Sequence, residues 1–115
     1  MNYLITESQV GKLSLTYLNN TYGLEEVRIE NHPNIIFFVR EGNIYMEYDT
    51  ENSEIYISNR LKNTLNRTLE NIFGLGLLDR HKVINNWIEQ YVNLNGNRVY
   101  HSESLPYTIK DVLEQ

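Results

Sequence analysis

Histidine is the residue type in this sequence best suited to bind a metal or to transfer a proton near neutral pH. The chain has three histidines, His32, His81 and His101, which lie far apart in the sequence. None belongs to a His-x-x-x-His or Glu-x-x-His pattern, the spacing that presents two ligands on one helical face. There is also no cysteine to supply a thiolate ligand. The sequence therefore predicts no metal site and no cofactor.

An acidic segment is the next candidate for chemistry, because five acidic residues lie between Glu41 and Glu54 without one lysine or arginine. The stretch from Asp49 to Glu54 superficially resembles a calcium loop, but it lacks the twelve-residue frame, the central glycine and the flanking helices. We interpret it as a solvated hairpin turn. The alternative is that this acidic hairpin docks on a basic surface of a partner.

Glycine and serine patterns also bear on catalysis. Gly74 and Gly76 follow an expected helix instead of a strand, so they predict a helix stop and a turn and not a phosphate cradle. No Gly-x-Ser-x-Gly occurs, and no nucleophile is spaced to meet a base. We expect a protein that is not an enzyme. The alternative is a small metal-dependent hydrolase or nuclease whose carboxylates converge only in the fold to bind Mg²⁺.

Composition narrows the class of protein. The chain has 115 residues, 41% of them apolar and 22% charged, which predicts a single domain over residues 1–115. The helical and alternating patterns described below predict that this domain is α+β. Its net charge is −5 and its basic residues are dispersed. A nucleic-acid-binding accessory protein is therefore only the third hypothesis for the function, after a protein that is not an enzyme and a metal-dependent hydrolase or nuclease. The first residues lack the pattern of a signal peptide, and no run of about 18 apolar residues predicts a membrane span. Sixteen asparagines, nine tyrosines and no alanine suggest an AT-rich genome.

Helical spacing appears in three long segments. The first helix is expected over residues 7–22, where Thr6 and Gln9 have the spacing of a capping box and Gly23 supplies a left-handed stop. The second is expected over residues 59–73. Asp79 should cap a third helix, the most deeply packed one, which ends near residues 95–97. Its apolar positions recur at three-and-four spacing: Val83, Ile84, Trp87, Ile88, Tyr91 and Val92.

Between residues 24 and 58 the apolar pattern alternates and is broken at three polar turns, which predicts a four-stranded antiparallel meander. Two further helices should pack on one face of this sheet. Residues 98–101 are expected as a fifth strand, and residues after Pro106 as a short closing helix. The expected core-facing positions are Val27, Ile29, Ile35, Phe37, Val39, Ile44, Met46, Tyr48, Ile55 and Ile57.

The outward face of the meander is the feature that predicts a function. Half of its positions are apolar or aromatic, and a soluble monomer seldom leaves such a patch open. Either the C-terminal segment covers this face or a partner does. The full set is Arg28, Ile36, Phe38, Arg40, Tyr45, Glu47, Glu54 and Tyr56. As partner-binding residues we predict Ile36, Phe38, Arg40, Tyr45, Glu47 and Tyr56.

Three short segments carry a resemblance: residues 5–9 (ITESQ), residues 17–18 (YL) and residues 86–89 (NWIE). They resemble a loose set of short uncharacterised proteins of tailed bacteriophages, many of them marine. The resemblance implies a phage origin, and with it a location in the host cytoplasm or the virion; it transfers no activity. We therefore expect a non-enzymatic phage protein that acts through protein–protein contact, with a viral or host protein or a second copy as partner, and not with nucleic acid or a membrane.

Overall fold

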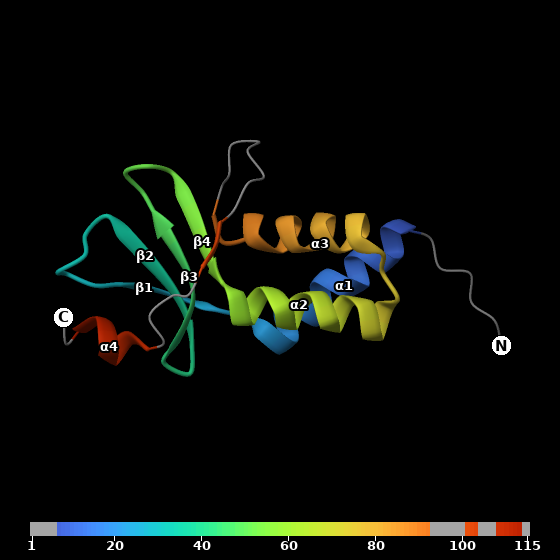
Figure 1. Ribbon diagram of the computed structural model, residues 1–115, viewed down its shortest axis with the longest axis horizontal. Helices are drawn as coiled ribbons and strands as arrows, with labels where there is room; N and C mark the ends of the chain where they lie inside the picture. The colour runs from blue at the N-terminus through green and yellow to red at the C-terminus, as the bar shows by residue number, and fades with distance from the viewer. Residues whose placement is uncertain (1–6, 93–100, 104–107, 114–115) are drawn as a thin grey trace.

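The fold begins with a helix and continues as a sheet that carries helices on one of its faces (Figure 1). The computed structural model describes residues 7–92, 101–103 and 108–113. The predicted α+β class, with its four-stranded antiparallel meander and short C-terminal helix, is confirmed. The elements in chain order are α1 (Glu7–Tyr22), β1 (Glu25–Arg28), β2 (Ile35–Arg40), β3 (Asn43–Asp49), β4 (Glu54–Ser58), α2 (Asn59–Phe73), α3 (Leu77–Glu89), β5 (His101–Glu103) and α4 (Ile109–Leu113).

Helix α2 has well-defined signals at both ends. The hydroxyl of Ser58 accepts a hydrogen bond from the Leu61 N–H at 3.1 Å and caps the first turn. At the other end Gly74 adopts the left-handed conformation, with φ of 64°, and its N–H donates to the Glu70 carbonyl. The N–H of Leu75 donates to the carbonyl of Leu69. This paired arrangement satisfies the last carbonyls of α2 and confirms the predicted helix stop.

Three of the predicted helix signals are wrong in detail. Gly23 is not left-handed; a Cβ at that position would instead lie 2.7 Å from the Asn19 carbonyl oxygen, so close backbone approach explains the glycine. Helix α3 begins at Leu77, before Asp79, with Gly76 as its N-cap. Asp79 therefore lies in the first turn, where its negative charge is favourable to the helix dipole. Helix α3 ends at Glu89, with Gln90 as its C-cap, earlier than the predicted end near residues 95–97. Thr6 and residues 95–97 themselves lie outside the described residues.

The sheet has the strand order β1-β2-β3-β4-β5. The first four strands pair in antiparallel fashion, whereas β5 runs parallel to β4. The predicted fifth strand overlaps β5 only at His101, because residues 98–100 lie outside the described part of the chain. The antiparallel turns place the β2–β3 hairpin and the start of α2 near the end of α1 (Figure 1), which is where the cleft described below is formed.

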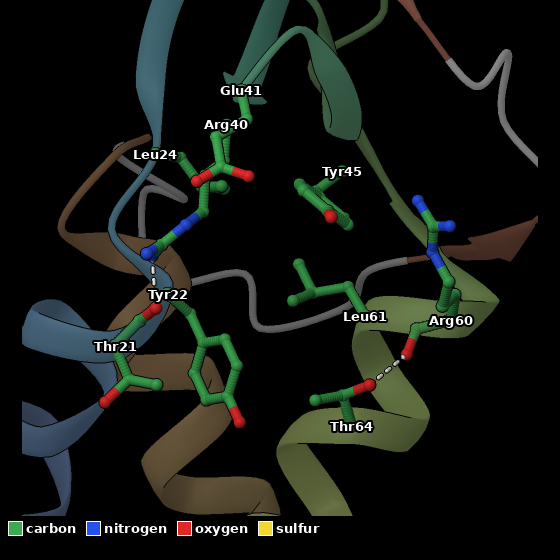
Figure 2. Close-up of a pocket in the computed structure, with 9 residues that line it drawn as sticks. All are labelled: Thr21, Tyr22, Leu24, Arg40, Glu41, Tyr45, Arg60, Leu61 and Thr64. Carbon is green, nitrogen blue, oxygen red and sulfur yellow. Dashed lines mark hydrogen bonds between the residues drawn. The ribbon is translucent and has the colours of Figure 1, made fainter.

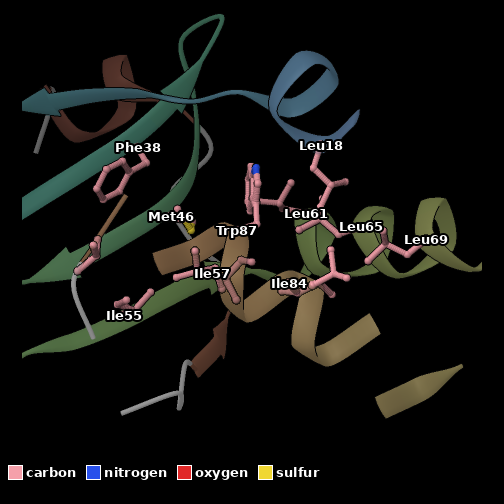
Figure 3. Packing of buried hydrophobic residues seen from close by; sticks show 13 residues of the cluster. Leu18, Phe38, Met46, Ile55, Ile57, Leu61, Leu65, Leu69, Ile84 and Trp87 are labelled. Carbon is pink, nitrogen blue, oxygen red and sulfur yellow. The ribbon is translucent and has the colours of Figure 1, made fainter. Parts of the chain in front are cut away.

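Helices α1, α2 and α3 cover one face of the sheet with a large apolar cluster (Figure 3). Trp87 of α3 is fully buried, and its ring meets the ring of Tyr91 edge-on at 5.2 Å between centroids. Tyr91 in turn meets Phe38 of β2 at 5.5 Å. This aromatic series joins α3 to the sheet. The wide apolar side predicted for α3 is confirmed by the burial of Val83, Ile84, Trp87 and Ile88.

The predicted assignment of the two sheet faces is wrong for the segments of β1 and β2 and for Ile44 in β3. Met46, Tyr48, Ile55 and Ile57 do pack toward the helices, as expected. The other six residues assigned to that side form a second apolar cluster with α4 on the opposite face of the sheet. These residues are Val27, Ile29, Ile35, Phe37, Val39 and Ile44.

The cause lies in the pattern of β2 and in one irregularity. Residues 35–39 are all apolar, so alternation cannot decide which set faces the helices. In addition, the register with β3 shifts between Phe38 and Val39: Phe38 pairs with Met46, whereas Val39 pairs with Ile44. Tyr45 is the extra residue of this bulge. Ile44 and Met46 consequently lie on opposite faces although they are two residues apart.

Helix α4 covers part of the second apolar cluster. The N–H of Ile109 donates to the Gly42 carbonyl at 3.0 Å, which ties α4 to the β2–β3 turn. Thr108 and Asp111 exchange hydrogen bonds between side chain and backbone, at 3.3 and 3.1 Å, and cap the helix reciprocally. Val112 is only 3% exposed within the cluster. The apolar face turned away from the long helices was expected to be covered either by the C-terminal segment or by a partner. The C-terminal helix α4 covers the part of that face around Val112.

Candidate functional site

The six predicted partner-binding residues do not form one exposed face. Phe38 is 2% exposed within the helix-covered cluster, and Ile36 packs partly against the same cluster. Glu47 and Tyr56 are paired neighbours on the other side of the sheet, where the Tyr56 hydroxyl donates to Glu54. The predicted docking face is therefore wrong, because its residues lie on both sides of the sheet and this chain's own helices cover Phe38 and part of Ile36. The remaining two, Arg40 and Tyr45, line a cleft.

The cleft lies between the end of α1, the β2–β3 hairpin and the start of α2 (Figure 2). Its volume is about 380 Å³, within the roughly 300–1,000 Å³ range of ligand pockets. Figure 2 shows Tyr45 in its middle, above Leu61 and between two arginines from opposite walls. The complete lining is Thr21, Tyr22, Leu24, Arg40, Glu41, Tyr45, Arg60, Leu61 and Thr64.

Arg60 stands at one wall of the cleft because Ser58 caps α2 and fixes its first turn. Its guanidinium carbon lies 5.3 Å from the centroid of the Tyr45 ring, within the distance of a cation–π interaction. Tyr45 reaches this position as the extra residue of the bulge. Within the described part of the chain, Arg60 forms no ion pair. The bulge and the helix cap thus place an uncompensated cation against an aromatic ring.

Arg40 and Glu41 form the opposite wall. The Arg40 guanidinium donates to the Thr21 carbonyl and so closes the last turn of α1 with a positive charge. Glu41 and Gly42 both have positive φ, 52° and 80°, the mark of a two-residue type I′ hairpin. The left-handed backbone conformation of Glu41 is uncommon for a residue other than glycine. The tight turn holds its carboxylate at the rim of the cleft, as Figure 2 shows.

A second surface lies at the far end of the helices from the sheet. The end of α2, the connection of residues 74–76 and the start of α3 together form residues 72–78, with the sequence IFGLGLL, called the apolar turn below. Ile72 and Leu77 are more than half exposed, and Leu78 is 77% exposed. On α1, Leu13 is also more than half exposed, and Tyr17 one turn later meets Phe73 edge-on at 5.7 Å. Leu13 therefore lies on the side of α1 that faces the apolar turn.

The apolar turn is held in one conformation by Arg80. Its guanidinium donates to the Leu75 carbonyl at 2.9 Å and to the Asn66 side chain at 3.2 Å, and it lies 3.7 Å from the Glu70 carboxylate. The left-handed Gly74 fixes the other side of the turn. The glycines of this segment were predicted as a helix stop, which is confirmed. The five apolar residues around them indicate an exposed apolar surface, which was not predicted from the sequence.

The acidic turn between β3 and β4 is built as an Asx turn. The Asp49 carboxylate accepts hydrogen bonds from the Asn52 side chain at 2.9 Å and from the N–H groups of Glu51 and Asn52. These bonds, those from Asn52 foremost, hold the pKa of Asp49 below its ordinary value of 3.8. The predicted hairpin turn is confirmed. Among residues 7–92, 101–103 and 108–113, no three His, Asp or Glu side chains gather as a possible metal site.

Comparison with known proteins finds no matching family model, no matching curated protein and no matching solved structure. In the described ranges, every helix is too short or too polar to span a lipid bilayer. His32 meets the ring of Phe37 edge-on at 6.1 Å between centroids. The function is therefore argued from two surfaces, the cleft and the apolar turn.

Proposed function

We propose that this chain is a non-enzymatic phage protein that acts through protein–protein contact, as a minor virion component or as a modulator of a host protein. The observation that carries the proposal is the apolar turn, a rigid projection with large apolar side chains in solvent. Contiguous exposed apolar residues on a soluble domain are a common mark of an interaction site. Because Arg80 and Gly74 already fix the backbone, docking would cost little conformational entropy.

The shape of the apolar turn favours a concave partner over a second copy. Leu13, Ile72, Leu77 and Leu78 together offer on the order of a few hundred Å² of apolar surface. A stable flat interface buries roughly 800 Å² on each side, so two such turns meeting end to end would fall short. A projecting helical hairpin that enters a partner's apolar pocket buries its sides as well as its tip. The partner we propose is therefore a different protein, viral or host.

The phage assignment has separate support. It comes from the resemblance of residues 5–9, 17–18 and 86–89 to short phage proteins and from the asparagine-rich, alanine-free composition. Mass spectrometry of purified virions tests the first of the two roles. Stoichiometric recovery of the chain in particles supports a virion component, whereas its exclusion from particles together with presence in infected cells supports a modulator of a host protein.

Site-specific photocrosslinking tests the contact surface. A photoreactive residue is placed at Leu78, and a matched control is placed at Asn63, an exposed position in the second turn of α2. In cells that naturally make the chain, position 78 should crosslink to one discrete protein and position 63 should not. That protein, once purified, should bind Leu78→Ser at least about tenfold more weakly than the unmodified chain, because truncation of a buried interface anchor costs this much or more.

Three results would contradict the proposal. Equal crosslinking from both positions would mark the adducts as random encounters. Adducts formed only with a second copy of the chain would replace the different partner by self-association. Unchanged affinity of Leu78→Ser for the captured protein would remove the apolar turn from the interface. An unchanged unfolding midpoint of Leu78→Ser serves as the control for folding, because this side chain is already 77% exposed.

A further inference from the structure

Arg60 is an exposed cation in an acidic protein, and it stands at the wall of a cavity. The chain carries a net charge of −5, so carboxylates are available to most of its basic residues. Arg28 and Arg80 do pair, with Glu26 and Glu70. In the part of the chain that the structure describes, Arg60 instead has the Tyr45 ring as its neighbour and no carboxylate within ion-pair distance. Its planar fork of N–H donors therefore remains able to bind an oxyanion.

The surroundings of Arg60 add an apolar component. Below the Tyr45 ring, the cleft is lined by Leu61 and Tyr22, and the Tyr22 hydroxyl is occupied at 2.9 Å by Thr68 (Figure 2). A ligand resting there would meet carbon surface on the floor and a guanidinium at the edge.

The charge balance of the cleft distinguishes between oxyanions. Among the described residues that line the cleft, the charged ones are Arg40 and Arg60, with two positive charges, and Glu41, with one negative charge. The net charge is therefore +1. A carboxylate carries −1 and neutralises it, whereas a phosphate monoester carries roughly −1.5 to −2 at neutral pH and would leave excess negative charge beside Glu41. The cleft is matched to a single carboxylate.

We propose that this cleft binds a carboxylate attached to an apolar or aromatic group, with Arg60 as the anchor of the carboxylate and Tyr22, Tyr45 and Leu61 as the apolar floor. This chemistry is shared by a free aromatic acid and by the C-terminal carboxylate of a peptide that ends in an apolar residue. The inference does not rest on the proposed function. The cleft and the apolar turn lie at opposite ends of α2, a helix of 15 residues that is about 20 Å long.

NMR titration with N-acetyl-phenylalanine tests the proposal. The amides of residues 60–64 and of Gly42 should shift in a saturable manner. N-acetyl-phenylalaninamide, which lacks the carboxylate, and acetate, which lacks the ring, should each bind at least about tenfold more weakly, the usual effect of losing a charge-assisted hydrogen bond or a buried ring. A tetrapeptide that ends in phenylalanine separates the two sources: tighter binding than N-acetyl-phenylalanine indicates a peptide C-terminus, and equal binding indicates a small acid.

Three charge variants sharpen the titration. Arg60→Gln should weaken the binding of N-acetyl-phenylalanine by about tenfold, and Arg60→Lys should recover only part of it, because lysine keeps the charge and loses the planar fork. Arg67→Gln is the matched control, an exposed arginine on the same helix outside the cleft, and should change affinity less than about twofold. Glu41→Gln should strengthen binding, since it removes the opposing charge.

The proposal is overturned if N-acetyl-phenylalanine produces no saturable shift at these amides. It is overturned equally if the amide probe binds as well as the acid, or if Arg60→Gln and Arg67→Gln behave alike. Tighter binding of phenyl phosphate than of N-acetyl-phenylalanine would replace the carboxylate by a phosphate. Folding is monitored by the unfolding midpoint of each variant, and Arg60 is exposed, so the loss of its cation–π contact should lower that midpoint only slightly.

Discussion

Helix α4 offers a quantitative test of how the second face of the sheet is covered, because two adjacent apolar residues on it differ in burial. Val112 is 3% exposed, whereas Leu113 is 57% exposed. Val112→Ala removes two buried carbons at about 0.8 kcal/mol each and leaves a small cavity, so the free energy of unfolding should fall by about 2 kcal/mol. Leu113→Ala removes more carbon, but water already reaches most of it, so the loss should be about 1 kcal/mol or less.

The assay is chemical denaturation of both variants beside the unmodified chain, with hydrogen exchange of the Ile109 amide as a local readout. That amide donates to the Gly42 carbonyl at 3.0 Å, so it reports whether α4 stays attached to the β2–β3 turn. Val112→Ala should accelerate its exchange more than Leu113→Ala does. Equal losses from the two variants, or a larger loss from Leu113→Ala, would refute the idea that α4 seals this face through Val112.

Two further predictions concern the turns. Gly74→Ala should lower the free energy of unfolding by about 1 kcal/mol, because φ is 64° at this position and a left-handed conformation is costly for alanine. Gly76→Ala, where φ is −72°, should lower it clearly less in the same denaturation experiment. Equal losses would contradict the idea that the left-handed conformation of Gly74 requires glycine. Asn52→Ala should raise the pKa of Asp49 toward its ordinary value of 3.8, since it removes the Asn52 side-chain hydrogen bond, the largest of the contributions that lower this pKa. The stabilisation from ionised Asp49 is fully present above pH 3.8 and is lost as the pH falls through the lowered pKa. An NMR titration of the Asp49 carboxyl measures this pKa. An unchanged pKa in Asn52→Ala would contradict the prediction.

Much of the fold could be predicted from local patterns. The bounds of α1 and α2, the four strands and the closing helix follow from period changes and polar breaks, which are written in short stretches of sequence. The face assignment could not be predicted from these patterns alone. The five apolar residues of β2 satisfy either face, and the bulge at Tyr45 depends on pairing with a strand several residues away. Alternation identifies a strand, whereas tertiary pairing determines which side of it faces the helices.

The candidate sites likewise include features that local sequence patterns could predict and features that depend on tertiary contacts. Arg40 and Tyr45 were expected on an open sheet face and lie instead in the cleft, because the face that carries them is turned toward the helices. Arg60 could not be predicted, since an arginine in the first turn of a helix is ordinary until the Tyr45 ring is placed beside it. The apolar turn could have been predicted: a helix stop surrounded by five apolar residues leaves little room to bury them all.

The most direct test of the proposed function is the solvent accessibility of the Leu78 methyl groups, measured by NMR with a soluble paramagnetic agent. In the isolated chain these methyls should be strongly broadened, as a side chain that is 77% exposed requires. After addition of the partner identified by crosslinking, they should become protected, while buried Leu65 stays protected in both states. Methyl groups of Leu78 that are already protected in the isolated chain, or that remain broadened in the complex, would contradict the proposal that the apolar turn is the contact surface.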